Sequence, residues 1–497
     1  MSTNYGLRST GLLVFSGRLV SAFTGLVFTV MVARWLSPSG FGTWEVIITL
    51  VTFSSYPVGL VAYWATRDVA RGKMIGRTAI FSGLLLSALG FGIYFAFTSF
   101  TYSTIASAIL PFLLGAVLVP LSYWSAVANA VVQGFRPGAY AYSLVISEGA
   151  KLVVAYEALY VYRYGIDGVL IALMAAYFVQ SVCSTYFVRL TTTEGFSLGQ
   201  VKRWARLSWV PLVSYLPTAL AVADTYVVAL GFGTTLVGYY QVAFTIASVI
   251  GYSYWLAFSL YPLLLRGGDE RLPSVSIEYS LLFGIPLAAG GVVLAGPILY
   301  LVGGGSKYLP GTAGLEVLSI MFVFTALSMI LDQTLLGTER ADVGDRPSFW
   351  ALVRSNLLFV PVVNILFGIV YVPSLYVAMT YATSAGLDSS SKVVVWAAVE
   401  FVSTVAFLLV KARRARRYAK LMPSVSVAYY LVGAAAMSVV LYLLSGVAAE
   451  QGTGTLLYAA RLLGIGLVGL ASYGGVVYLL DPKFRSLSGS LARKLLR

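Results

Sequence analysis

Charged side chains stand inside long apolar stretches of this sequence, and their types decide which chemistry they can do. The basic ones include Arg18, Lys151 and Arg354. An arginine binds a phosphate through two parallel hydrogen bonds, whereas a lysine acts as a point charge. Because a charge at the centre of a membrane helix costs about 2.5–3.5 kcal/mol on insertion scales, we expect these side chains to face protein or water. Arg18, Lys151, Arg354 and the neighbouring Glu148 are therefore candidate substrate-binding residues around an anion.

Structural alternatives stay open for the same groups of residues. Glu148 and Lys151 are three positions apart on one helical face, so they can simply neutralise each other. Arg461 and Asp332 lie near the ends of expected helices, where a charged group can reach the membrane surface. Asp224 is either a proton or cation site or the structural partner of an arginine.

Several other chemistries lack the residues that they require. The chain has no histidine and a single cysteine, Cys183, which excludes a disulfide within the chain, a histidine base and a zinc site. The run GGGSK at 303–307 lacks the Gly-Lys-Ser/Thr half of a phosphate-binding loop. We expect no catalytic residue, no metal and no cofactor.

Composition predicts the elements that must position these charges. The chain has 497 residues, 59% hydrophobic and 10% charged, with a mean hydropathy of +0.86. Apolar runs of 18 or more residues recur along it, and each can cross a bilayer core of roughly 30 Å as a helix. We expect an all-α membrane protein with fourteen transmembrane helices, at about 10–33, 44–66, 78–100, 105–132, 139–162, 168–190, 209–230, 238–264, 277–302, 312–336, 347–371, 392–410, 425–445 and 455–480.

The basic residues between these spans predict the orientation. With both termini in the cytoplasm, the inner segments hold 25 lysines and arginines and the outer segments hold four, namely Arg34, Arg163, Lys307 and Lys392. Attraction of the inner loops to anionic cytoplasmic lipid accounts for the net charge of +14, so no nucleic acid partner is needed. The prediction is a multi-pass protein of the cell (cytoplasmic) membrane.

The connections between the expected helices are short. The longest outer one is predicted at 373–391, and the longest inner one at 191–208, with a short surface helix around VKRWARLSW. No segment is long enough for a soluble catalytic domain, and no outer loop holds a carboxylate cluster. We therefore expect a protein that is not an enzyme.

A weak internal repeat divides the chain. An offset of 196 residues aligns 28–56 with 224–252, with seven identities in 29 positions, including Gly42 with Gly238. The repeat unit is six helices, an even number, so both copies cross the membrane in the same direction. The expected parts are a six-helix lobe at 1–190, a cytoplasmic connector at 191–208, a second six-helix lobe at 209–410, a basic cytoplasmic loop at 411–424, and helices 13 and 14 with a basic tail at 425–497.

Four segments resemble a known family of membrane proteins. VARWLSPSGFGTWEVI at 32–47 and ADTYVVALGFGTTLVGYYQVA at 223–243 are similar to the first and seventh-to-eighth helix signatures of polysaccharide-export flippases. NAVVQGFRPGAYAYSLVISEGAKLVVAY at 129–156 and YLVGGGSKYLPGTAGLEVLSI at 300–320 resemble two further connections of that family. It belongs to the multidrug/oligosaccharidyl-lipid/polysaccharide exporter (MOP) superfamily.

The resemblance implies a function. Family members flip polyprenyl-linked oligosaccharides from the cytoplasmic to the outer leaflet by alternating access. Arg18, Lys151 and Arg354 would then hold the phosphate or pyrophosphate, and Asp224 would bind a coupling H⁺ or Na⁺. The two additional helices are similar to those of lipid II flippases, which puts the substrate in question more than the fold.

Two alternatives stay open. A multidrug or organic-cation antiporter of the same superfamily would line its cavity with carboxylates, such as Glu148, Asp224 and Glu400. A membrane glycosyltransferase or glycan polymerase would need carboxylates in a sizeable outer loop.

Overall fold

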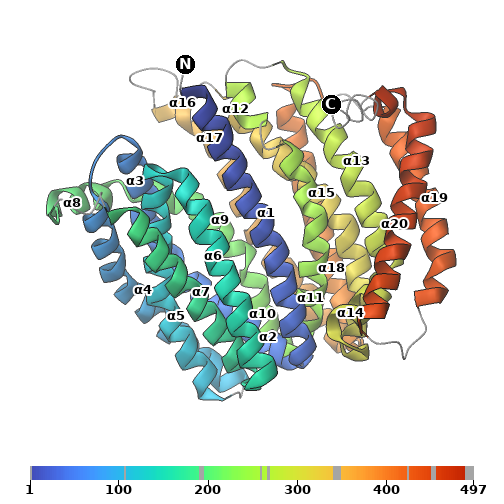
Figure 1. The fold of residues 1–497 in the computed structure, drawn as a ribbon, viewed down its shortest axis with the longest axis horizontal. Coiled ribbons are helices and arrows are strands. Elements are labelled where there is room, and N and C mark those ends of the chain that lie inside the picture. The colour runs from blue at the N-terminus through green and yellow to red at the C-terminus, as the bar shows by residue number, and fades with distance from the viewer. Residues whose placement is uncertain are drawn as a thin grey trace. The chain divides into compact units, whose positions relative to one another are not determined.

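Helices make up all the regular secondary structure in the part of the chain that the structure describes. The computed structural model describes residues 3–105, 108–189, 195–257, 260–265, 269–339, 349–421, 425–448 and 455–486 (Figure 1). Parts of the expected connector, basic loop and tail, at 191–194, 422–424 and 487–497, lie outside these residues. Within the described ranges, 13 helices are long and apolar enough to cross a membrane. The all-α membrane fold is confirmed.

The count of fourteen spans stays a prediction, as does the orientation of the termini. The span expected at 139–162 is present as α6 (Pro137–Tyr156), but α6 is not among the 13 apolar helices. It carries Glu148 and Lys151 in its middle, which lowers its apolarity.

The chain divides into two compact units, residues 1–238 and 239–497. The elements that lie wholly in the first unit are α1 (Thr3–Trp35), α2 (Pro38–Ser55), η1 (Tyr56–Val58), α3 (Gly59–Ala70), α4 (Gly76–Ile105), α5 (Ile109–Phe135), α6, η2 (Glu157–Val161), α7 (Ile166–Phe187), α8 (Leu198–Arg206), α9 (Trp209–Ala221) and α10 (Ala223–Phe232). The remaining elements are α11 (Thr234–Gly251), whose first residues belong to the first unit, η4 (Tyr252–Ala257), α12 (Leu260–Leu265), α13 (Leu272–Val293), α14 (Ala295–Gly303), η5 (Ser306–Gly311), α15 (Thr312–Gly337), α16 (Phe349–Arg354), α17 (Asn356–Ser384), α18 (Ser389–Ala415), α19 (Val425–Ala448) and α20 (Thr455–Leu480).

Each unit has its own set of packed helices. In the first unit, α1 packs on α6, α6 on α7, and α5 on α3, α4 and α7. In the second unit, α15 packs on α13 and α18, and α19 packs on α13 and α20.

Capping residues explain where two of these helices begin. Ser37 precedes α2 and accepts a hydrogen bond from the Gly40 amide at 3.1 Å, with Pro38 at the first helical position. Asp388 precedes α18 and accepts from the Ser391 amide at 3.2 Å. Hydrogen bonds from Ser391 hold the pKa of the exposed Asp388 carboxyl below its ordinary value.

The prediction of one long outer loop is wrong. The segment 373–391 was expected to be the longest outer connection, but α17 continues through Pro373 to Ser384. A proline is tolerated in a membrane helix because neighbouring groups can satisfy the freed backbone carbonyl. Only 385–388 separate α17 from α18.

Two glycines that the predicted repeat aligns, Gly42 and Gly238, approach each other within the first unit. A Cβ atom added at Gly42 would overlap the carbonyl of Thr234, and one added at Gly238 would overlap the carbonyl of Pro38. The offset of 196 relates Gly42 to Gly238 and Pro38 to Thr234. The two contacts are therefore reciprocal, which is the pattern that a local two-fold pseudo-axis produces. Only glycine fits at either position.

Candidate functional site

The predicted residues Glu148 and Lys151 form an ion pair where α6 packs on α1. Lys151 Nζ lies 2.6 Å from Glu148 Oε2, and the two side chains are only 11% and 12% exposed. From α1, the hydroxyls of Ser21 and Thr24 donate to the Glu148 carboxylate at 3.1 and 2.7 Å. The neutralising pair that the spacing allows is present, and it lowers the positive charge that Lys151 offers to an anion.

Aromatic rings complete the surroundings of Lys151. Its ammonium lies 5.2 Å from the centre of the Phe28 ring, which in turn packs edge-on against Trp44. Arg18 is on the same helix as Phe28, one turn before Ser21, and its side chain is exposed. Two of the four candidate substrate-binding residues, Glu148 and Lys151, are thus in direct contact. Arg18 lies nearer the start of α1 than the residues that contact this pair.

Arg354 is the last residue of α16, immediately before the break at Ser355 that separates α16 from α17. Its side chain is exposed, and its carbonyl accepts a hydrogen bond from Arg414 at 3.0 Å. Arg354 belongs to the second unit, whereas Arg18 and Lys151 belong to the first. Its role in binding stays a prediction.

Asp224 follows a break in a helix that the sequence predicts to be continuous. The expected span 209–230 is divided at Val222 into α9 and α10, and Asp224 lies buried in the first turn of α10. Its carboxylate accepts from the Thr225 amide at 2.6 Å. Discontinuous helices hold substrate and coupling ions in several transporter folds. Asp224 therefore remains a candidate for the coupling ion.

A second buried ion pair joins α15 and α18 in the second unit. Lys411 Nζ lies 2.8 Å from Asp332 Oδ2 and 2.9 Å from Ser328 Oγ, and the lysine side chain is 5% exposed. Lys411 was expected in the basic cytoplasmic loop, which is wrong, because α18 continues to Ala415. Asp332, which lies near the end of α15, is thus paired with a lysine of α18.

Glu400, one of the three carboxylates that would line the cavity of an antiporter, accepts a hydrogen bond from the hydroxyl of Tyr240. The ring of Tyr240 stacks on Trp396 at a centroid distance of 3.8 Å, and Trp396 Nε1 donates to Tyr371 Oη at 2.9 Å. These contacts fix Glu400 in an aromatic cluster of the second unit.

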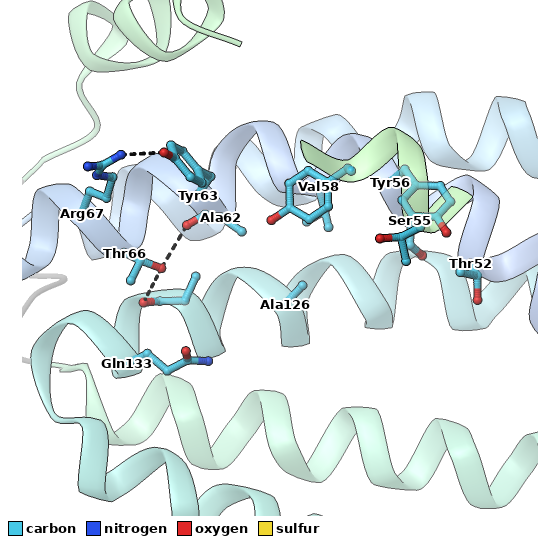
Figure 2. Close-up of a pocket in the computed structure, with 14 residues that line it drawn as sticks. Thr52, Ser55, Tyr56, Val58, Ala62, Tyr63, Thr66, Arg67, Ala126 and Gln133 are labelled. Carbon is cyan, nitrogen blue, oxygen red and sulfur yellow. Dashed lines mark hydrogen bonds between the residues drawn. The ribbon is translucent and has the colours of Figure 1, made fainter. Parts of the chain in front are cut away.

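The first unit contains a cavity that the sequence analysis missed. It has a volume of about 740 Å³ and lies between α2, η1, α3, α5 and α9. Figure 2 shows Thr52 toward one end and Arg67 toward the other. The described lining residues are mostly small or hydroxyl-bearing, and Arg67 is the only charged one among them: Thr52, Ser55, Tyr56, Val58, Gly59, Ala62, Tyr63, Thr66, Arg67, Ala126, Ala130, Gln133, Tyr215 and Thr218.

Several polar side chains of this cavity are hydrogen-bonded within the protein, and one buried hydroxyl is not. Arg67 donates to Tyr63 Oη at 2.5 Å, and its guanidinium lies 5.3 Å from the centre of that ring (Figure 2). The Thr66 hydroxyl donates to the carbonyls of Ala62 and Ala130, both at 3.1 Å. The hydroxyl of Tyr56 is buried and has no hydrogen-bond partner among the described residues. Seven of the lining residues follow one another at intervals of one to four positions, a spacing that could have indicated one face of a helix. They are Thr52, Ser55, Tyr56, Gly59, Tyr63, Thr66 and Arg67.

The residue after Arg67 points into a different environment. Asp68 is 1% exposed and accepts from Gln200 and Trp204 on α8 at 2.5 and 2.9 Å. It also pairs with Lys73 at 3.1 Å and Arg203 at 3.5 Å. The short helix predicted in the connector is confirmed as α8, and Asp68 fastens it to the end of α3.

We predict that Asp68→Asn loosens α8. The amide keeps the shape but loses the charge, so hydrogen bonds worth about 1.5–3 kcal/mol each to a charged group weaken. Hydrogen–deuterium exchange of 198–206 should accelerate at least tenfold, whereas Asp388→Asn, at an exposed helix cap, should leave that exchange unchanged. Equal protection of α8 in both variants would contradict the anchoring role of Asp68.

Comparison with known proteins identifies the fold. No family model matches the sequence, and no curated protein matches it either. A solved structure of the lipid II flippase MurJ in an inward closed conformation is similar, with a TM-score of 0.65 and 14% identity, covering 98% of this chain and 100% of that one. An inward-facing multidrug resistance MATE family transporter of the MOP superfamily gives a TM-score of 0.59 at 15% identity and covers 82% of this chain and 98% of that one. The chain therefore has the fold shared by these transporters, in a multi-pass membrane protein.

Proposed function

We propose that this protein moves a lipid-linked oligosaccharide, carried on a polyprenyl phosphate or pyrophosphate, from the cytoplasmic to the outer leaflet of the cytoplasmic membrane. The observation that supports this most is the extent of the likeness to the lipid II flippase. Its 98% coverage leaves only about 10 of 497 residues unmatched, so the match must include most of α19 and α20. The likeness to the MATE transporter covers 82% of the chain.

Alternating access is the proposed mechanism, with the six-helix lobes at 1–190 and 209–410 as the moving parts. The headgroup carries a phosphate or pyrophosphate, and an arginine can bind such a group through two parallel hydrogen bonds. We assign this role to Arg18 and Arg354, with Lys151 and Glu148 contributing as a pair. Asp224 is proposed to bind the coupling H⁺ or Na⁺. No chemical step on the substrate is required, so the proposed protein is a transporter and not an enzyme.

Charge reversal tests these roles. We expect Arg18→Glu and Arg354→Glu each to lower glycan export at least tenfold, because a carboxylate repels the phosphate that the arginine would bind. Arg416→Glu, at an exposed position beyond the end of α18, is the matched control. Export in whole cells is measured together with the amount of protein in the membrane. Normal export by both variants would remove the two arginines from the mechanism.

A multidrug or organic-cation antiporter is the second candidate, supported by the TM-score of 0.59 to the MATE transporter. The two candidates predict different consequences of deleting the gene. A flippase deletion should make a lipid-linked saccharide accumulate in the inner leaflet, and mass spectrometry of extracted lipids would identify it. An antiporter deletion should leave those lipids unchanged and sensitise cells to cationic dyes.

A further inference from the structure

The cavity between α2, η1, α3, α5 and α9 has the size of a ligand site. Its volume of about 740 Å³ falls within the range of about 300–1,000 Å³ that is usual for such sites. All of its walls come from the first unit, residues 1–238. None of the substrate-binding residues predicted from the sequence is among its described lining residues, so it is a separate site within the first unit.

The charges around the cavity favour an anion. Among the described residues that line it, Arg67 is the only charged one and none is a carboxylate. An organic cation would meet no opposite charge there, whereas a phosphate would meet a guanidinium with a fork of donors. The cavity therefore distinguishes between the two candidate functions.

Arg67 also remains available to an external anion, unlike the buried lysines of the protein. Lys151 and Lys411 are neutralised by carboxylates at 2.6 and 2.8 Å. The carboxylate nearest to Arg67 in the sequence, Asp68, is instead held by α8 and Lys73. Arg67 has the hydroxyl and the ring of Tyr63 as its partners.

The rest of the lining suits a saccharide. The buried hydroxyl of Tyr56 has no partner among the described residues, although a buried polar group normally has one. Tyrosine rings can also cover the apolar faces of a sugar ring, and Tyr215 from α9 supplies one more. That ring lies directly over Gly59, where an added Cβ would overlap it, so glycine is needed for this wall to close.

We infer that this cavity is a binding site for the phosphorylated saccharide headgroup, with Arg67 binding the phosphate and Tyr56 hydrogen-bonding the sugar. The inference rests on the proposed function and deepens it, because it names the headgroup chemistry that the first unit recognises. Tyr63 orients the Arg67 guanidinium, and Tyr215 closes the cavity from α9.

Binding to the purified full-length protein in detergent tests the inference. The probes are a short-chain polyprenyl pyrophosphate bearing one N-acetylhexosamine, the same lipid without the sugar, an alkyl glycoside without phosphate, and inorganic pyrophosphate. We expect Arg67→Gln to weaken binding of both pyrophosphate lipids about 10- to 100-fold, the effect of losing a charge-assisted hydrogen bond, and to leave the alkyl glycoside unaffected. Arg71→Gln, an exposed neighbour that does not line the cavity, is the control.

Tyr56→Phe separates the sugar from the phosphate. It should weaken the sugar-bearing lipid about fivefold, the value of one neutral hydrogen bond, and leave the sugar-free lipid unchanged. Arg67→Lys should give intermediate affinity for the pyrophosphate lipids, because a point charge replaces the bidentate donor. Tight binding of the lipids with weak binding of inorganic pyrophosphate identifies a headgroup site; equal affinity for both would overturn the assignment to a lipid-linked headgroup.

The outcomes separate this inference from the proposed function. If the wild-type protein binds the sugar-bearing lipid and Arg67→Gln and Tyr56→Phe bind it equally well, the cavity assignment is wrong and the flippase proposal stands. If the wild-type protein binds none of the phosphorylated lipids, both fail together.

Discussion

Replacing Lys411 by methionine should destabilise the protein by about 3–5 kcal/mol, the usual cost of leaving one member of a buried ion pair without its partner. Methionine preserves the apolar stem but leaves Asp332 without its ammonium partner at 2.8 Å. The carboxylate must then stay ionised in a poor environment or take up a proton. Either outcome lowers the free energy of unfolding, measured by denaturant titration in detergent.

A second lysine provides the matched control. Lys420 lies 4.0 Å from Glu270, with the two side chains 59% and 65% exposed, so Lys420→Met should cost no more than about 1 kcal/mol. The double variant Lys411→Met with Asp332→Leu should recover most of the lost stability, because it removes both charges. Similar stabilities for Lys411→Met and Lys420→Met would contradict the account of the buried pair.

Gly42→Ala should have the next largest effect, about 3 kcal/mol, at the upper end of the costs of overpacking. The added methyl would overlap the backbone carbonyl of Thr234, which cannot rotate away as a side chain does. The helix α2 and residues 234–238 would have to separate. Gly238→Ala should cost a similar amount, because its methyl meets the Pro38 carbonyl in the reciprocal contact.

Gly25→Ala, at a glycine within α1, is the control for Gly42→Ala. No atom lies within 4 Å of a Cβ built at Gly25, so alanine should stabilise α1 there by about 0.5–1 kcal/mol through its higher helix propensity. Thermal melting of the three variants in detergent makes the comparison. A melting temperature for Gly42→Ala at or above that of Gly25→Ala would show that the close contact is absent.

Periodicity and charge predict the helices well because bilayer length and apolarity dominate membrane segments. The spans at 312–336 and 455–480 match α15 and α20 within one residue. Hydropathy does not predict where a helix is interrupted within such a segment. Val222 interrupts a helix within an apolar run, whereas Ser355 lies between the polar residues Arg354 and Asn356. Most of the loop expected at 373–391 is helical, because Pro373 and polar side chains are tolerated within a membrane helix.

The candidate site could be predicted only in part, since partners across helices are invisible in one sequence. The spacing of Glu148 and Lys151 gives their ion pair directly, as both lie on one helix. The pair of Asp332 with Lys411 spans 79 positions and has no such signal. Arg67 directly follows the expected span 44–66, so the sequence predicts it in a loop, whereas α3, α5 and α9 place it at a cavity with Tyr63 and Tyr215.

Transport into sealed vesicles tests the central claim most directly. The purified protein is reconstituted into liposomes with a fluorescent polyprenyl pyrophosphate that bears a disaccharide, and a membrane-impermeant quencher reports the leaflet of each molecule. Loss of nearly all the fluorescence with the wild-type protein, against about half in protein-free vesicles, is the result we predict. Loss of only half in both, together with protein-dependent uptake of ethidium, would contradict the flippase and favour the organic-cation antiporter.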